Sequence, residues 1–307
     1  MGWGCYKMNK IIVNLFFYVV FLSFGLSTGP QTIYVIQNAS LLSNSSTGLA
    51  KSHYLNPANL VNLNGYVSFS NNNANFDLKG QKISLLNSSD DSNSLFSFES
   101  LSSSSIPIYG ESTSDDGPEG YFDSYWYACE FSRIINMSNY FDLFENITFG
   151  FKIKGYMYKL FTLKSSDYSI SFGINKKINE QLKLGLVVNN IGVKKIDNLS
   201  NQISGTYDGR EDYGVGVYYL VPNDLFGIAA DFYFRNDVVV SKLAFESNFP
   251  IFNLSLGSTN YGSYKDFCYG FSLDLNNWNI EYGYLTYDDT GQKYLGNPSS
   301  IQISRKF

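Results

Sequence analysis

Apolar and polar side chains alternate with a period of two through the second half of the chain. Within residues 147–154, the apolar side chains of Ile147, Phe149, Phe151 and Ile153 share one face, and Thr, Gly and Lys occupy the other. The same alternation recurs over residues 168–175, 182–189, 226–235 and 267–276. Because successive side chains of a strand point to opposite faces, each run predicts a β-strand with one apolar face. By contrast, residues 71–120 are rich in Asn, Ser, Asp and Gly, and we read them as hairpins with long polar loops.

Strand length and the polar faces favour a membrane barrel over a soluble β-sandwich. Many predicted strands have the roughly 9–11 residues that a tilted strand needs to cross a bilayer, whereas sandwich strands usually have about 5–6. Their polar faces hold mostly Gly, Ser, Thr and Asn, as a narrow lumen requires. We therefore predict an all-β fold, a transmembrane antiparallel up-and-down β-barrel of about 14 strands over residues 63–307. A soluble secreted β-sandwich with an adhesive role is the alternative.

Aromatic side chains gather near the ends of the predicted strands, as the interfacial girdles of a membrane barrel would. They include Tyr125, Trp126, Tyr127, Tyr156, Tyr158, Tyr218, Tyr219, Trp278 and Tyr287.

Composition narrows the function classes. Only 16% of the 307 residues are charged, below the roughly 25% of a soluble domain, while 17% are aromatic. The net charge of -5 and the lack of a basic stripe argue against nucleic acid as a partner. His53 is the single histidine, which weakens any catalytic triad or histidine metal site. We predict neither an enzyme nor a bound cofactor.

The N-terminus has the order of a secretory signal. Lys7 and Lys10 precede an apolar run over residues 11–26, and small residues follow at 27–29. We predict a signal peptide over residues 1–28 and export to the cell outer membrane. An uncleaved anchor, or a start at Met8, stays open. No second run of about 18 apolar residues follows, so the exported protein is either soluble or a barrel.

Paired carboxylates and two cysteines are further candidates for chemistry. Asp pairs at 90–91, 115–116 and 288–289 lie in polar loop sequence, where solvated loops are a better interpretation than acid–base catalysis or calcium binding. Cys129 and Cys268 both lie in strand-like runs. Two separate thiols are favoured over a disulfide, although the sequence leaves their pairing open.

Charged side chains on the polar faces are predicted to point into the barrel lumen, where they could form a salt-bridged plug or line a path. These candidates are Lys152, Lys154, Asp231, Arg235, Asp274 and Glu281.

The chain ends in a strand that carries a terminal aromatic. Ile301, Ile303 and Phe307 fall on one face of the sequence SSIQISRKF. This ending resembles the signal by which the barrel-assembly machinery recognises its outer-membrane clients, so that machinery is an expected partner.

Two segments resemble the PorV/PorQ-like, FadL-related outer-membrane barrel family. The first is TGLAKSHYLNPANL at residues 47–60, with its triplet Asn56, Pro57 and Ala58; the second is residues 168–195, with a strand corner at Asn190, Ile191 and Gly192. The resemblance covers about a third of the chain by motif. It places residues 29–62 at or in the barrel lumen.

The resemblance implies assistance in the secretion or surface attachment of exported proteins. Its implied partners are outer-membrane lipid, secretion-system components and exported cargo. The alternative within the same resemblance is a FadL-like channel for small hydrophobic molecules.

Overall fold

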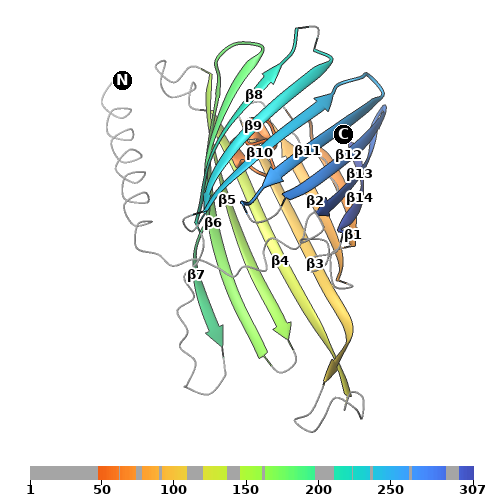
Figure 1. Ribbon diagram of the computed structural model, residues 1–307. Helices are drawn as coiled ribbons and strands as arrows, with labels where there is room; N and C mark the ends of the chain where they lie inside the picture. Colours follow the sequence, from red (N-terminus) through yellow and green to blue (C-terminus); the bar gives the residue numbers. More distant parts are fainter. Residues whose placement is uncertain are drawn as a thin grey trace, which may run out of the picture.

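The protein folds as a closed β-barrel in a computed structural model (Figure 1). The structure describes residues 48–61, 63–73, 78–89, 92–108, 120–136, 146–160, 163–197, 211–222, 224–235, 238–262, 265–287 and 297–307. The predicted signal peptide at residues 1–28 lies outside the described residues, and the predicted N-terminal segment is described only from Gly48. No helix within these ranges is long and apolar enough to cross a membrane.

The described residues form fourteen strands and one short 3-10 helix. Their bounds are η2 Pro57–Leu60, β1 Tyr66–Asn73, β2 Lys79–Ser88, β3 Asn93–Ile108, β4 Gly120–Asn136, β5 Ile147–Leu160, β6 Leu163–Lys177, β7 Leu182–Asp197, β8 Asp212–Leu220, β9 Phe226–Arg235, β10 Val238–Ser247, β11 Phe252–Asn260, β12 Lys265–Leu275, β13 Trp278–Tyr287 and β14 Ser299–Lys306.

Each strand pairs antiparallel with its neighbours in the sequence, and β1 pairs with β14 to close the sheet. The seam runs from the Tyr66–Lys306 pair to the Asn73–Ser299 pair. It ends with the Phe307 amide donating to the Gly65 carbonyl at 3.1 Å, and the Phe307 ring lies over Gly65. This topology confirms the predicted up-and-down barrel.

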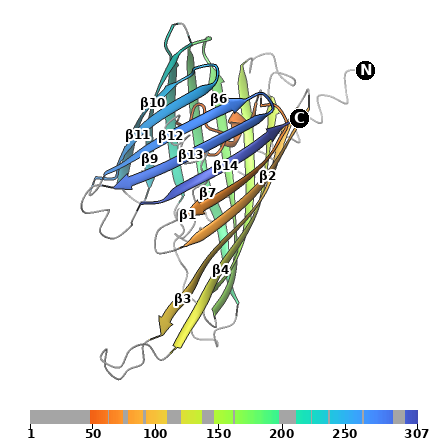
Figure 2. The same ribbon diagram turned by 90° about the vertical axis from the view of Figure 1, so that its right-hand side faces the viewer.

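The wall of the barrel is tall on one side and short on the other. Strands β3 to β7 have 14 to 17 residues, whereas the other strands have 8 to 11. In Figures 1 and 2 the tall side extends beyond the rest of the wall toward the bottom of each view. We call this the far end, and the opposite end, where Gly65 and Phe307 meet, the plug end.

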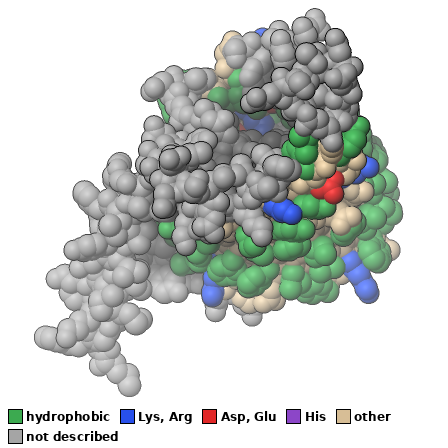
Figure 3. Space-filling view, turned by 90° about the horizontal axis from the view of Figure 1, so that it is seen from below, with side chains coloured by type: hydrophobic (Ala, Val, Ile, Leu, Met, Phe, Trp, Pro, Cys, Tyr) green, Lys and Arg blue, Asp and Glu red, His purple; other side chains and the backbone are tan. Residues whose placement is uncertain are grey.

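The apolar faces predicted from the alternation lie on the outside of the barrel. Ile153, Leu186 and Phe232 are each 44–49% exposed, while the side chains between them are buried or half-buried on the inner face. Figure 3, seen from the far end, shows hydrophobic side chains along the outer surface with few Lys or Arg among them. An apolar outer face on a closed sheet fits a lipid-facing wall. Further exposed apolar side chains are Phe69, Ile83, Phe96, Phe98, Val217, Ile228, Leu243, Leu256, Phe267 and Phe271.

One local expectation is revised. Asn190 does not end a pair of strands: β7 continues to Asp197, and Asn190 sits with a φ of 62° where the β6–β7 register shifts. The motif is therefore a bulge, which bends the strand and increases its twist instead of closing a hairpin. The favoured prediction of two separate thiols is confirmed: Cys129 is exposed on the outer face, Cys268 is buried on the inner face, and neither forms a disulfide. The wall between them prevents a disulfide.

Leu243 gives a direct test of the lipid-facing wall, because it lies near the middle of β10 and is 65% exposed. We expect Leu243→Arg to lower the free energy of unfolding in lipid by about 2–4 kcal/mol, since a charge on the lipid face must leave water. Equilibrium unfolding in liposomes, followed by the gel mobility of unheated samples, measures the change. Asn277→Arg, in the exposed β12–β13 turn, is the matched control and should be near neutral. Equal effects of the two substitutions would contradict a lipid-facing β10.

Candidate functional site

Residues 48–61 lie inside the barrel, and we call this segment the plug. It appears in orange within the wall in Figure 1, and its 3-10 helix packs against β4, β5 and β6. The Asn56 side chain accepts from the Ala58 amide at 3.0 Å, and Pro57 takes the first helical position, where its missing N–H costs nothing. The Asn-Pro-Ala triplet thus starts the helix of the plug.

Asn56 also attaches the plug to the wall. Its Nδ2 donates to the carbonyl oxygens of Ile174 on β6 and Leu186 on β7, at 3.1 and 3.3 Å, and to Leu49 within the plug at 3.1 Å. Asn59 Nδ2 donates to the Leu49 carbonyl at 2.7 Å. Both amides are buried, where a lost hydrogen bond costs about 1–3 kcal/mol. An amide serves here because it donates and accepts at once.

Glycines of the wall let the plug approach the strand backbone. Gly150 on β5 pairs with Gly173 on β6, and Gly185 on β7 pairs with Gly216 on β8. A Cβ on Gly150 would overlap the plug backbone at Pro57 and Ala58, and one on Gly173 would overlap the Asn56 side chain. A Cβ on Gly185 would lie 2.6 Å from the Leu49 carbonyl oxygen. The plug therefore packs directly against these four glycines, which we call the glycine bed.

Acidic side chains hold the N-terminal part of the plug. The Leu49 amide donates to both carboxylate oxygens of Asp231, at 3.1 and 3.0 Å. Gly48 precedes it with a φ of +75°, a conformation that favours glycine. Lys51 forms an ion pair with Glu246, which also accepts from the Tyr218 hydroxyl. Strands β8, β9 and β10 thus anchor one end of the plug.

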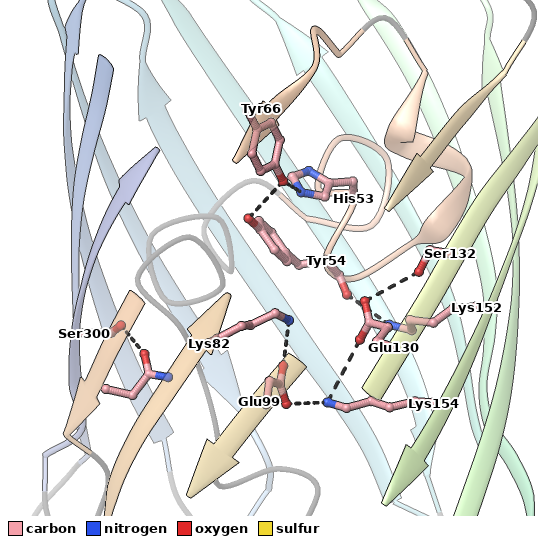
Figure 4. A network of polar contacts seen from close by, with 11 residues as sticks. His53, Tyr54, Tyr66, Lys82, Glu99, Glu130, Ser132, Lys152, Lys154 and Ser300 are labelled. Carbon is pink, nitrogen blue, oxygen red and sulfur yellow. Dashed lines mark hydrogen bonds and ion pairs between the residues drawn. The ribbon is translucent and has the colours of Figure 1, made fainter. Parts of the chain in front are cut away.

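A buried ion cluster lies next to the plug on β2, β3, β4 and β5 (Figure 4). Glu99 is its centre: one carboxylate oxygen is 2.6 Å from Lys82 Nζ and the other is 2.7 Å from Lys154 Nζ. Lys154 Nζ is also 4.0 Å from Glu130. Lys152 Nζ donates to the Tyr54 carbonyl at 3.3 Å, which connects the cluster to the plug. Burial makes this pairing necessary, because an unpaired charge here would be costly.

Aromatic residues of the plug lie between this ion cluster and β1. The Tyr66 hydroxyl is 3.2 Å from His53 Nε2 and 3.5 Å from the Tyr54 hydroxyl. The His53 and Tyr54 rings lie with centroids 3.9 Å apart and their planes tilted by 39°, and Lys82 Nζ is 5.8 Å from the centroid of the Tyr54 ring. Figure 4 shows Tyr54 between His53 and Lys82. The single histidine of the chain is therefore a packing and hydrogen-bonding residue of the plug.

Hydroxyl groups continue the polar lining across β1, β2 and β3. Ser68, Ser84 and Ser97 face the lumen in one cross-strand row, and Ser70, Lys82 and Glu99 form the next row. Among the described residues, the buried hydroxyls of Ser70, Ser84 and Ser97 have no hydrogen-bond partner. Buried polar groups are normally satisfied by protein, water or a bound molecule. We call these three residues the serine lining.

The residues predicted from the sequence fall at several places. Lys152, Lys154 and Asp231 contact the plug or the ion cluster, as given above. Asp274 and Glu281 face inward near the seam: Asp274 is 2.5 Å from Lys306 Nζ, and Glu281 is 3.5 Å from Gln302 Nε2. The backbone of Arg235 pairs with Val238, and its side chain lies outside the described residues. Ile301, Ile303 and Phe307 are exposed on the outer face, with Phe307 74% exposed.

Sequence reasoning missed Lys82, Glu99 and Glu130. Lys82 and Glu99 lie in the Asn- and Ser-rich stretch that was read as hairpins with long polar loops, whereas the structure has the regular strands β2 and β3 there. The signal was present: in LFSFES, the polar Ser97 and Glu99 alternate with Phe96 and Phe98. A period-two pattern within a polar stretch marked these inner positions.

No cluster of three or more metal-binding side chains occurs in the described ranges. No protein-family model matches the chain, and no curated protein matches it.

Solved structures do match. The toluene transporter TodX of Pseudomonas putida superimposes with a TM-score of 0.60 over 88% of this chain and 98% of its own, at 11% identity. The CymD monoaromatic hydrocarbon channel superimposes with a TM-score of 0.57 over 86% and 97% of the two chains, at 10% identity. These two channels share its fold. At such low identity the likeness shows the fold, a closed antiparallel β-barrel, and not the family or the substrate.

Gly173 tests the contact between plug and wall. We expect Gly173→Ala to lower the free energy of unfolding by about 1–3 kcal/mol, because the new methyl group overlaps the buried Asn56 amide. Trypsin cleavage after Lys51 should also become faster. Gly155→Ala is the matched control, since no atom lies within 4 Å of a Cβ at that glycine. Equal stability of the two variants would show that the plug does not rest on Gly173.

Glu99 tests the ion cluster. We expect Glu99→Gln to lower the free energy of unfolding by about 3–5 kcal/mol, because Lys82 and Lys154 lose their main buried partner. Glu180→Gln is the control: Glu180 pairs with Lys177 in an exposed turn, where such a pair is worth at most about 1 kcal/mol. Denaturant titration of both variants measures the difference. An effect of Glu99→Gln no larger than that of the control would rule out a structural role for the cluster.

Proposed function

We propose that this protein is an outer-membrane channel for small, largely apolar molecules that also carry a hydrogen-bonding group. The observation that carries the proposal is the serine lining, which places three unpartnered hydroxyls inside a barrel of this fold. The likeness to TodX and CymD over nearly their whole lengths supports a channel. A molecule on this route would meet hydroxyls and the ion cluster, and could satisfy the serines that lack a partner.

Placement in the outer membrane is part of the proposal. The apolar outer face and the closed sheet support it, since a spanning sheet must pair all of its backbone groups. The described turns at the plug end are short, for example residues 178–181 and 276–277. Because such barrels have short periplasmic turns and longer outer loops, we place the plug end toward the periplasm.

The plug determines whether the lumen is open to a passing molecule. It is held by buried hydrogen bonds to the β6 and β7 backbone and to Asp231, so passage requires either a path beside the plug or its displacement. The serine lining lies on the side of β1, β2 and β3, away from the glycine bed on β5 to β8. We infer that small molecules pass along the serine lining while the plug stays on the glycines.

Transport into proteoliposomes tests the proposal with two probes of similar shape, p-cresol and toluene. We expect the protein to speed p-cresol entry over protein-free liposomes by more than it speeds toluene entry. The triple variant Ser70→Ala, Ser84→Ala, Ser97→Ala should lose most of this preference, because it removes the available hydroxyls. Ser102→Ala, on the outer face of β3, is the control.

The outcomes separate the parts of this proposal. If neither probe enters faster than in protein-free liposomes, the channel itself is disproved. If toluene enters as readily as p-cresol and the triple variant behaves like wild type, the channel stands but the role of the serine lining is wrong.

A second candidate is the secretion or surface attachment of exported proteins, in the manner of the PorV/PorQ-like barrels. The tall wall of β3 to β7 favours it, because a sheet that projects past the rest of the barrel offers a partner an accessible surface (Figures 1 and 2). Deletion of the gene should then remove a defined exported protein from the cell surface, and the wild-type gene should restore it. Normal surface display together with defective p-cresol uptake would favour the channel.

A further inference from the structure

The outer face of β2 to β5 carries a cavity of about 510 Å³ that lies outside the lumen. Its lining comes from four adjacent strands, β2 to β5. A volume of this size is within the roughly 300–1,000 Å³ of small-molecule sites. We call it the outer notch; it is lined by Ile83, Leu85, Phe96, Ser97, Phe98, Cys129, Glu130, Phe131, Ile153 and Gly155.

Two small residues side by side create the notch. Cys129 on β4 pairs with Gly155 on β5, and both face outward. The neighbouring row of the same face holds Phe96, Phe131 and Ile153, whose larger side chains form one wall of the notch. A Cβ on Gly155 would have no atom within 4 Å, in contrast to the glycines under the plug. Packing within the protein therefore gives no reason for a glycine at this position.

The walls of the notch are held in place by ring contacts. Phe96 and Phe131 lie with ring centroids 4.8 Å apart on one side, and Phe98 stacks on Tyr127 at 6.2 Å on the other. Phe131 also contacts Phe151 edge-on at 5.9 Å. Such aromatic pairs stabilise a fixed arrangement by about 0.5–1.5 kcal/mol each. The notch is thus preformed, which lowers the cost of binding.

The position and charge of the notch identify its occupant. Apart from Ser97 and Glu130, whose side chains face the lumen, the lining residues belong to the apolar outer face, so hydrocarbon is the matching chemistry. Arg133 lies on the same face of β4, two residues beyond Phe131 toward the plug end, and its guanidinium donates to Ser92 Oγ at 3.3 Å. Two residues of strand span about 7 Å. A phosphate at Arg133 would leave a hydrocarbon chain directly over Phe131, Cys129 and Gly155.

We propose that the outer notch binds one acyl chain of an anionic phospholipid whose phosphate lies at Arg133. Guanidinium pairs strongly with phosphate oxygens, which gives the preference for an anionic head group. The inference needs only the lipid-facing wall, and it stands or falls separately from the channel. It also accounts for Gly155, which leaves room for the chain.

Native mass spectrometry tests this proposal on the full-length protein. The protein is reconstituted in nanodiscs that contain equal amounts of phosphatidylglycerol and phosphatidylcholine. It is then transferred to a mild detergent, and the mass of the protein with its bound lipid is measured. Wild type should retain one phosphatidylglycerol. Gly155→Leu fills the notch and should lower the retained fraction at least fivefold. Val215→Leu places the same leucine side chain on the exposed outer face of β8, away from the notch, and should change nothing.

Arg133→Gln separates the head group from the chain. This variant should still retain lipid, but phosphatidylglycerol and phosphatidylcholine in equal amounts. Gel mobility of unheated samples verifies folding, and Cys129→Leu replaces Gly155→Leu if that variant does not fold. Wild-type retention by the filling variant would overturn the proposal. So would retention of a free fatty acid, or of a second protein chain, at the expense of the phospholipid.

Discussion

The pairing of β1 with β14 is the contact on which the rest of this structure depends. A sheet in lipid cannot leave backbone N–H and C=O groups unpaired, since each would cost several kcal/mol. The seam joins the first strand, β1, to the last strand, β14, and the Phe307 amide extends it by one more hydrogen bond. Once the sheet is closed, every strand has one face toward the outside of the barrel and one toward the lumen. That division then controls the chemistry of each face.

The polar and charged side chains of the inner face depend on partners within the barrel. It is enclosed, so charges there need partners and polar groups need hydrogen bonds. Glu99 forms ion pairs with both Lys82 and Lys154, and Lys152 donates a hydrogen bond to the Tyr54 carbonyl of the plug. Within the plug, the Leu49 amide donates to the Asp231 carboxylate and the Leu49 carbonyl accepts from the Asn56 side chain. The hydroxyls of Ser70, Ser84 and Ser97 are among the buried polar groups that lack a partner in the described residues, and they lie on adjacent strands, which is why they form the proposed path.

The glycines on the inner and outer faces of the wall differ in what occupies the space beside them. Gly150, Gly173 and Gly185 are small because the plug backbone occupies the space that a side chain would take. Gly155, on the outer face, is small although nothing occupies that space. The first case reports an internal contact of the chain. The second points to a molecule outside the chain, and the surrounding apolar wall indicates lipid hydrocarbon.

The period-two pattern, together with strand length and the small residues of the polar faces, predicted a barrel of about fourteen strands and identified the apolar faces. Side-chain direction alternates along any strand, so the sequence of residues 147–154 shows which side chains share a face without reference to the neighbouring strands. The resemblance carried by the Asn-Pro-Ala triplet implied that residues 29–62 lie at or in the lumen. Only the tertiary structure decided which inner charges meet, because Lys82, Glu99 and Lys154 are brought together by strand register. Register likewise placed Cys129 and Cys268 on opposite sides of the wall and set Gly173 beneath Asn56. Register depends on contacts between strands, and a single strand's sequence does not contain them.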